Sequence, residues 1–176
     1  KTAASALRRA VGRILPFGSG PVMVKGQGDV LAYLAKCCSP VPGEELVGYV
    51  TRGRGVSVHS VDCPNVRNFL YDPEREIEVE WARQNDTVYP VPLMIRTEDH
   101  PGMLARLTEA IAKESSNIRQ FEAEAVETGM GLIGVVVEVK NSKHLARLRR
   151  AIGNVQGVLQ VSRRRAGVGG AAEDLA

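Results

Sequence analysis

The chain has 176 residues, enough for one ordinary domain or two small ones, and 44% of them are hydrophobic, as in a typical globular protein. Aromatic residues make up only 5%, which argues against a stacking platform for single-stranded nucleic acid. The net charge is +3, no apolar run approaches the length of a membrane span, and nothing resembles an export signal. We therefore expect a cytoplasmic protein with reduced cysteines and no membrane contact. Because it begins with Lys1 rather than Met, we also expect it to be a piece of a longer chain.

Residues 1–21 predict a helical linker. Apolar residues recur at helical spacing over residues 2–15, with arginines opposite, and the Pro- and Gly-rich residues 16–21 then break the helix. This segment is basic. A second basic group lies near the other end of the chain: Arg147, Arg149, Arg150, Arg163, Arg164 and Arg165. Each group is either a solvated face or a contact for nucleic acid.

Residues 22–81 predict a small α+β domain. The expected elements are a strand at 23–24, a helix at 30–36 capped by Asp29, strands at 46–51 and 56–59, a short helix at 63–70 and a strand at 77–81. The two middle strands flank Arg52-Gly53-Arg54-Gly55, which reads as a hairpin turn. A domain this short has a modest core and would gain from a metal ion.

After a polar linker at 82–88, residues 89–165 predict the element order βαββαβ, and residues 166–176 a flexible tail. Pro90 and Pro92 cannot donate to a strand ladder, so regular pairing should begin near Leu93. Ser142 is expected to cap the second helix. This order gives a ferredoxin-like fold, a four-stranded antiparallel sheet with two helices on one face. The other face of the sheet then needs cover.

All three cysteines lie close together in sequence with a histidine, as Cys37, Cys38, His59 and Cys63. Their spacing, Cys-Cys-x20-His-x3-Cys, supplies the ligand types that zinc prefers, so zinc is the candidate cofactor. Adjacent cysteines differ from the usual Cys-x2-Cys arrangement, because neighbouring side chains diverge. The alternatives are a set of buried reduced thiols around a hydrogen-bonded histidine, and a catalytic Cys–His pair, for which no orienting acid stands at a recognisable spacing.

The hairpin turn is a candidate RNA contact. Arg52 and Arg54 project from its tip, Gly53 and Gly55 allow the backbone to approach a phosphate, and His59 follows within a few residues. The competing interpretation is a turn whose arginines are merely solvated.

The motif CCSPVPGEELVGYVTRGRGVSVH…DCPN resembles the regulatory C-terminal region of the long RelA/SpoT-type enzymes, which make and hydrolyse (p)ppGpp. The matching segment is known as the zinc-finger-like or RIS domain. The following YPVPLMIRTEDHPGMLARLTEAIAKESSNI resembles the ACT domain of the same family. The resemblance covers roughly residues 20–165, and no part of the chain resembles the hydrolase or synthetase domains. The family pattern has Asp after Pro-Gly and often a basic residue after the histidine. Here these are Glu44 and Ser60, and the second change removes a possible phosphate contact.

This resemblance implies a regulatory fragment that is not itself an enzyme. It would sense the ribosome, through ribosomal RNA and tRNA, with residues 22–81, and an amino acid or a partner with the ACT domain. The parent chain would be a GTP pyrophosphokinase and guanosine-bis(diphosphate) 3'-pyrophosphohydrolase of the stringent response. The alternatives are an amino-acid-binding module of a biosynthetic enzyme with a zinc-stabilised domain, and a small thiol enzyme.

ACT domains use the turn between their first strand and helix for an amino acid at a dimer interface. By that resemblance Asp99 would bind the ammonium, the amides of Gly102, Met103 and Leu104 the carboxylate, and Asn117 would come from the second copy. The aliphatic rim favours a branched-chain amino acid. The alternative is a simple helix start, with Asp99 as the cap and Gly102 for close packing.

Overall fold

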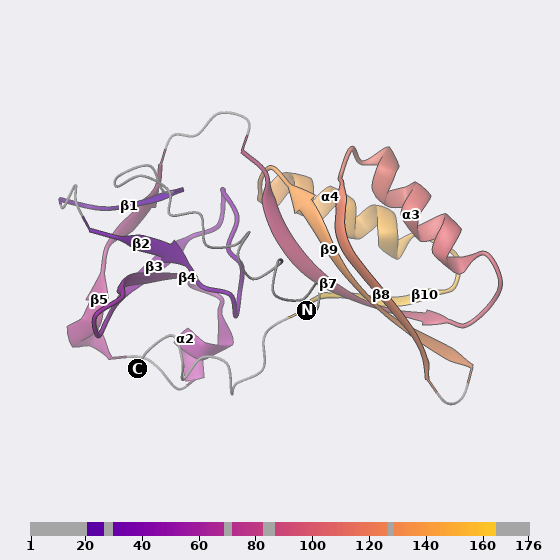
Figure 1. Cartoon of the computed structure of the whole chain (residues 1–176), viewed down its shortest axis with the longest axis horizontal. Coiled ribbons are helices and arrows are strands. Elements are labelled where there is room, and N and C mark those ends of the chain that lie inside the picture. Colours follow the sequence, from indigo (N-terminus) through magenta and orange to yellow (C-terminus); the bar gives the residue numbers. More distant parts are fainter. Residues whose placement is uncertain (1–20, 27–29, 69–71, 83–86, 127–128, 165–176) are drawn as a thin grey trace, which may run out of the picture.

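The computed structural model describes residues 21–26, 30–68, 72–82, 87–126 and 129–164, which form two domains side by side (Figure 1). The predicted tail, Asp29 and all of the predicted linker helix except Pro21 lie outside these residues. The first domain contains β1 (Val22–Val24), β2 (Ala32–Leu34), β3 (Leu46–Thr51), β4 (Gly55–Ser60), α2 (Pro64–Asn68), η1 (Pro73–Arg75), β5 (Glu76–Ile77) and β6 (Val79–Trp81). Within the described ranges, no helix is long and apolar enough to cross a membrane.

The first domain is built around the predicted hairpin, which the structure confirms. Strands β3 and β4 pair antiparallel from Leu46↔Ser60 to Thr51↔Gly55, inside a sheet of order β2-β4-β3-β5. Strands β1 and β6 form a separate two-stranded ribbon. Alternate residues of β1 and β4 point into a small core, whose buried members are Val22, Val24, Val56 and Val58. Four residues make a modest core, as the length of the domain predicts.

Two of the predicted elements in this domain are wrong. In place of a helix at 30–36, Ala32–Leu34 forms β2, which pairs parallel with β4. The run is too short for periodicity to separate helix from strand, and the open side of β4 offers it ladder bonds: Leu31 accepts from Val56 N and Ala35 N donates to Val58. The single strand expected at 77–81 is two short ones, because β5 pairs with β3 and β6 with β1.

The second domain has the predicted ferredoxin-like fold, and this fold class is confirmed. Its elements follow the order βαββαβ: β7 (Tyr89–Glu98), α3 (Met103–Lys113), β8 (Ile118–Val126), β9 (Met130–Val139), α4 (Ser142–Gly153) and β10 (Val158–Arg163). The strands lie in the order β10-β7-β9-β8, all antiparallel, and both helices cover one face (Figure 1). One side of β7 and β9 packs against the buried faces of the two helices. These faces are formed by Leu107 and Ile111 of α3 and by Leu148 and Ile152 of α4.

The prediction that regular pairing of β7 begins near Leu93 is wrong for its pairing with β9 and correct for its pairing with β10. Pairing with β9 begins at Tyr89↔Val139 and runs through both prolines, whereas pairing with β10 begins at Leu93↔Arg163. The carbonyl of Pro92 accepts from Arg164 N on the β10 side. The nitrogens of Pro90 and Pro92 therefore face that side too, so β9 loses no donor.

The cap of α4 is Asn141 rather than the predicted Ser142. The Asn141 side chain accepts a hydrogen bond from His144 N at 2.9 Å, and Ser142 is the first helical residue. We expect Asn141→Ala to lower the free energy of unfolding by about 1 kcal/mol, because a helix amide loses its acceptor, and Asn141→Asp to retain most of it. Chemical denaturation of the three proteins measures this difference, and equal stability of all three would contradict it.

Candidate functional site

The four predicted ligand residues converge from two separate segments of the RIS domain. Cys37 and Cys38 lie in the turn after β2, where Ser39 adopts φ 44° and its N–H donates to the Ala35 carbonyl at 2.9 Å. This tight turn directs both neighbouring thiols into one cluster, so the divergence expected of adjacent cysteines does not occur. His59 belongs to β4. Cys63 follows it and accepts from Val66 N and Arg67 N, so it caps α2 through its backbone.

The four side chains lie close enough together to hold one metal ion. Their ligand atoms all lie within 4.8 Å of one another. Cys37 Sγ lies 3.6 Å from Cys63 Sγ and 3.3 Å from His59 Nδ1, and Cys38 Sγ lies 4.0 Å from the same nitrogen. Zinc–ligand bonds of about 2.3 Å to sulfur and about 2.0 Å to nitrogen imply ligand–ligand distances of roughly 3.5–3.8 Å. The donor set therefore suits zinc, and its closest pairs lie near these distances.

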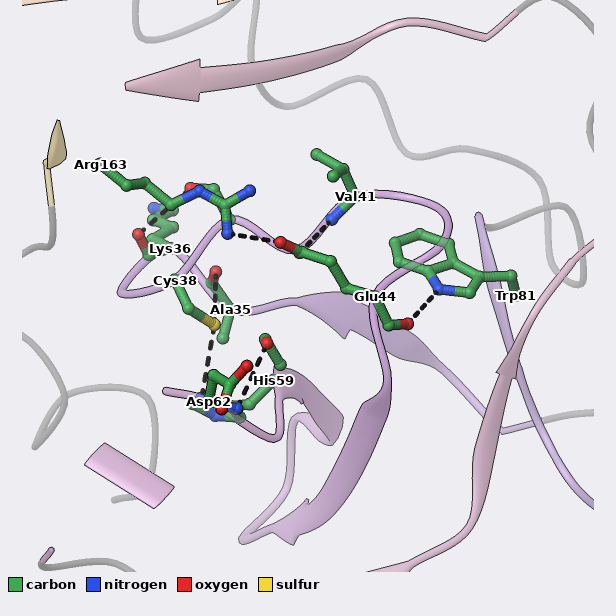
Figure 2. A network of polar contacts seen from close by, with 11 residues as sticks. Ala35, Lys36, Cys38, Val41, Glu44, His59, Asp62, Trp81 and Arg163 are labelled. Atoms are coloured by element: carbon green, nitrogen blue, oxygen red, sulfur yellow. Dashed lines mark hydrogen bonds and ion pairs between the residues drawn. The ribbon is translucent and has the colours of Figure 1, made fainter. Parts of the chain in front are cut away.

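The surroundings of His59 also suit a metal ligand. Its Nε2 lies 3.0 Å from the Ser57 hydroxyl, which leaves Nδ1 for the cysteines. Figure 2 shows Cys38 and His59 close together in the cluster. A hydrogen bond to the second ring nitrogen fixes the orientation of a ligating imidazole. Sequence reasoning missed Ser57, although its position two residues before His59 on one strand places both side chains on the same face.

The thiols and the imidazole shift one another's pKa values. Burial by itself would lower the pKa of His59, but hydrogen bonds with Cys37 and Cys63 and the charge on these sulfurs outweigh it and raise the pKa to about 9. Hydrogen bonds with Cys37 and Cys38 hold the pKa of Cys63 far below its usual range. Hydrogen bonds with Cys37 and Cys63, together with burial, raise the pKa of Cys38. Without metal, the cluster thus favours a thiolate beside an imidazolium, with a neighbouring thiol protonated.

Burial of the cluster argues against a thiol enzyme. The exposed fractions of Cys37, Cys38, Cys63 and His59 are 5%, 4%, 2% and 3%. A nucleophilic thiol has to meet its substrate, whereas a structural metal site is closed on all sides. The geometry therefore supports a closed structural site, or buried thiols, over catalysis.

The hairpin tip is exposed at both arginines. Arg52 and Arg54 alternate with Gly53 (φ 79°) and Gly55 (φ 90°). Both glycines adopt the left-handed conformation, which favours glycine over other residues. At Gly55, a Cβ would lie 2.2 Å from the Leu31 carbonyl oxygen. The turn therefore packs closely against the segment before β2 at Gly55, and both of its arginines are exposed.

The predicted RNA contact of His59 does not agree with the structure, because this side chain is buried. The ring points into the domain toward Cys37 and Ser57, away from the surface. It packs edge-on against the ring of Tyr49, with the two ring centroids 6.0 Å apart. His59 therefore belongs to the Cys/His cluster, and the surface candidates are Arg52 and Arg54.

The ACT domain has a cavity of about 540 Å³ at the end of β7 and the start of α3. Four of the predicted amino-acid-binding residues line it: Asp99, Gly102, Met103 and Leu104. Gly102 is the residue before α3, with φ 82°, and a Cβ at this position would meet no atom within 4 Å, so its role is conformational rather than close packing. Asp99 is not the cap of this helix. Sequence reasoning missed His100 and Glu124, which also line the cavity. Asn117 is exposed beyond the other end of α3, and its predicted contribution from a second copy stays a prediction.

Comparison with known proteins assigns both domains. Residues 22–82 match the RelA/SpoT RIS domain and residues 85–163 match the ACT domain. The chain is 38% identical over 156 residues to a GTP pyrophosphokinase of Myxococcus xanthus, covering 89% of this chain and 20% of that protein. It is 39% identical over 142 residues to the bifunctional (p)ppGpp synthase/hydrolase RelA of Mycobacterium tuberculosis, covering 81% of this chain and 19% of that protein.

Among solved structures, the ACT domain from a GTP pyrophosphokinase of Chlorobium tepidum is 32% identical, with a TM-score of 0.40, over 44% of this chain and all of that one. The chain spans about a fifth of the length of the curated relatives named above. The two described domains are therefore a RIS domain and an ACT domain of the RelA/SpoT type.

Proposed function

We propose that this chain is the regulatory region of a (p)ppGpp synthetase/hydrolase of the stringent response, which works in the cytoplasm. Its RIS domain senses the state of the ribosome by binding ribosomal RNA near a bound tRNA. Its ACT domain reads an amino acid or a partner, and both states pass to catalytic domains elsewhere in the parent chain. The RIS match over residues 22–82 favours this proposal over a free-standing ACT module of a biosynthetic enzyme.

The observation that carries the ribosome proposal is the hairpin tip. The tip carries two exposed arginines on a turn with two glycines, which leave no side chains of their own in the way of a partner. The turn belongs to the same domain as the Cys/His cluster. Guanidinium groups pair with phosphate in a forked geometry, and a rigid base keeps the ordering entropy of such contacts low. The experiment is removal of residues 22–165 from the full-length parent protein. (p)ppGpp synthesis should then no longer respond to ribosomes carrying uncharged tRNA, and an unchanged response would refute the proposal.

The cavity at the start of α3 supports the amino-acid part of the proposal. It combines a carboxylate on Asp99 with an aliphatic wall from Met103 and Leu104, the pattern that suits an ammonium group and a branched side chain. The half-exposed apolar residues Met94, Leu132 and Val136 on the uncovered face of the same sheet support pairing with a second copy of the chain.

We expect valine or leucine at millimolar concentration to shift the amide signals of residues 102–104 in NMR spectra of the chain. Asp99→Asn should weaken this response by roughly tenfold, because the ammonium loses a charged hydrogen-bond partner. The matched control is Glu98→Gln, which removes the neighbouring carboxylate but lies outside the set of described residues that line the cavity. An absence of shifts in the wild-type protein would assign this turn to packing alone.

A further inference from the structure

The two domains are joined by a short loop of the RIS domain that inserts into the ACT domain. We call residues 40–44 the docking loop. Val41 is 0% exposed and is a member of the ACT core cluster, although it belongs to the RIS segment of the chain. The Pro42 carbonyl accepts a hydrogen bond from Ser142 N at 2.8 Å, at the first residue of α4. At Gly43 (φ 94°) a Cβ would lie 2.4 Å from Ser142 Oγ, so the loop lies directly against the start of α4.

Glu44 ties the docking loop to both of its neighbours. One carboxylate oxygen accepts from Val41 N at 2.9 Å, and the other accepts from Arg163 Nη1 at 2.9 Å, at the end of β10 (Figure 2). The main-chain carbonyl of Glu44 accepts from Trp81 Nε1 at 3.1 Å. The side chains of Arg163 and Glu44 are 14% and 21% exposed, so solvent screens this ion pair less than a surface pair.

Both ends of the docking loop are attached to the Cys/His cluster. It follows the Cys37–Cys38 turn after a single residue, Ser39. At its other end, the Glu45 carbonyl accepts from Val61 N at 3.1 Å, and Val61 lies between His59 and Cys63 in sequence. A displacement of the loop would therefore move both segments that carry the four ligand side chains.

We propose that the ACT domain holds the Cys/His cluster closed through the docking loop. A ligand or partner that loosens the start of α4 or the end of β10 would then expose the three thiols and release a metal held between them. Coupling of this kind is reciprocal, so a closed cluster would in turn favour the docked ACT domain. The inference goes beyond the proposed function, and it holds whether or not the hairpin binds RNA or the cluster holds zinc.

The test uses the 176-residue chain as purified, with no chelator added, and the rate at which 5,5'-dithiobis(2-nitrobenzoate) labels its cysteines. Because the thiols are at most 5% exposed, labelling reports transient opening of the cluster. Arg163→Gln removes the charge that holds Glu44 and leaves the RIS sequence intact. We expect labelling to become roughly tenfold faster, as the loss of one partly buried charged hydrogen bond implies.

Two control variants separate coupling from general instability. Arg147→Gln removes an arginine whose ion pair with Glu114, at 3.5 Å, lies within the ACT domain, and Ile152→Val loosens the ACT core itself. Both should label at nearly the wild-type rate. Equal rates for wild type and Arg163→Gln would overturn the proposal. So would an acceleration in Ile152→Val as large as that in Arg163→Gln, because thiol exposure would then follow unfolding of the ACT domain rather than release of the loop.

Discussion

The purified chain is expected to carry about one equivalent of zinc, and its RIS domain to lose its fold when the metal is removed. Four ligand atoms lie within 4.8 Å of one another, whereas the valine core of the RIS domain centres on only four buried residues. Structural zinc in small domains contributes a binding free energy of about 10–16 kcal/mol, which is also folding free energy. Metal analysis and thermal melting with and without chelator measure both effects.

The matched comparison for this prediction is Cys63→Ser. It should lower the zinc content and the melting temperature, and chelator should then have little further effect. Because the pKa of Cys38 is raised in the metal-free cluster, zinc has to displace a proton there, so affinity should fall as the pH is lowered. A wild-type chain without metal whose melting is indifferent to chelator would leave the cluster as buried thiols.

Replacing Arg52 and Arg54 together by Ala is expected to weaken binding to structured ribosomal RNA by about 1–3 kcal/mol, the range for charge-assisted hydrogen bonds. Each arginine that neutralises a phosphate also releases condensed counterions, so the dependence of affinity on salt should become shallower in the variant. The melting temperature should stay close to that of the wild type, because both side chains are exposed. Fluorescence anisotropy with an RNA fragment at several salt concentrations measures affinity and slope together.

The control for the hairpin variant removes the same two charges from elsewhere. Arg149→Ala with Arg150→Ala takes them from the exposed face of α4, in the second basic group of the sequence. If the hairpin makes the specific contact, this control should lose much less affinity. Equal losses in the two double variants would mean that binding follows overall charge, and would contradict a role for the hairpin tip.

The parts of the fold that could be predicted are those whose signal is local. The β3–β4 hairpin is marked by alternating residues on either side of a Gly-rich turn, and the ACT elements by long periodic segments. The strand β2 could not be recognised, because its identity is decided by pairing with β4, which lies more than twenty residues later. Short apolar runs of this kind depend on tertiary partners rather than on their own pattern.

The candidate site shows the same division. The four cluster residues were identifiable from residue type, but their convergence depends on the turn at Ser39, whose positive φ has no mark in the sequence. The docking loop could not be foreseen either. Glu44 and Arg163 are 119 positions apart, and their pairing follows from the way two separately recognisable domains meet. Contacts between domains are set by surface complementarity, which periodicity and turn chemistry do not encode.

Co-sedimentation of the zinc-supplemented chain with purified ribosomes, over a series of salt concentrations, tests the central claim most directly. The wild-type chain should pellet with ribosomes at low salt and be released steeply as salt rises, while the variant lacking Arg52 and Arg54 should remain largely in the supernatant with an intact fold. Wild-type affinity and salt dependence in that folded variant would contradict the account and leave the hairpin as a structural turn.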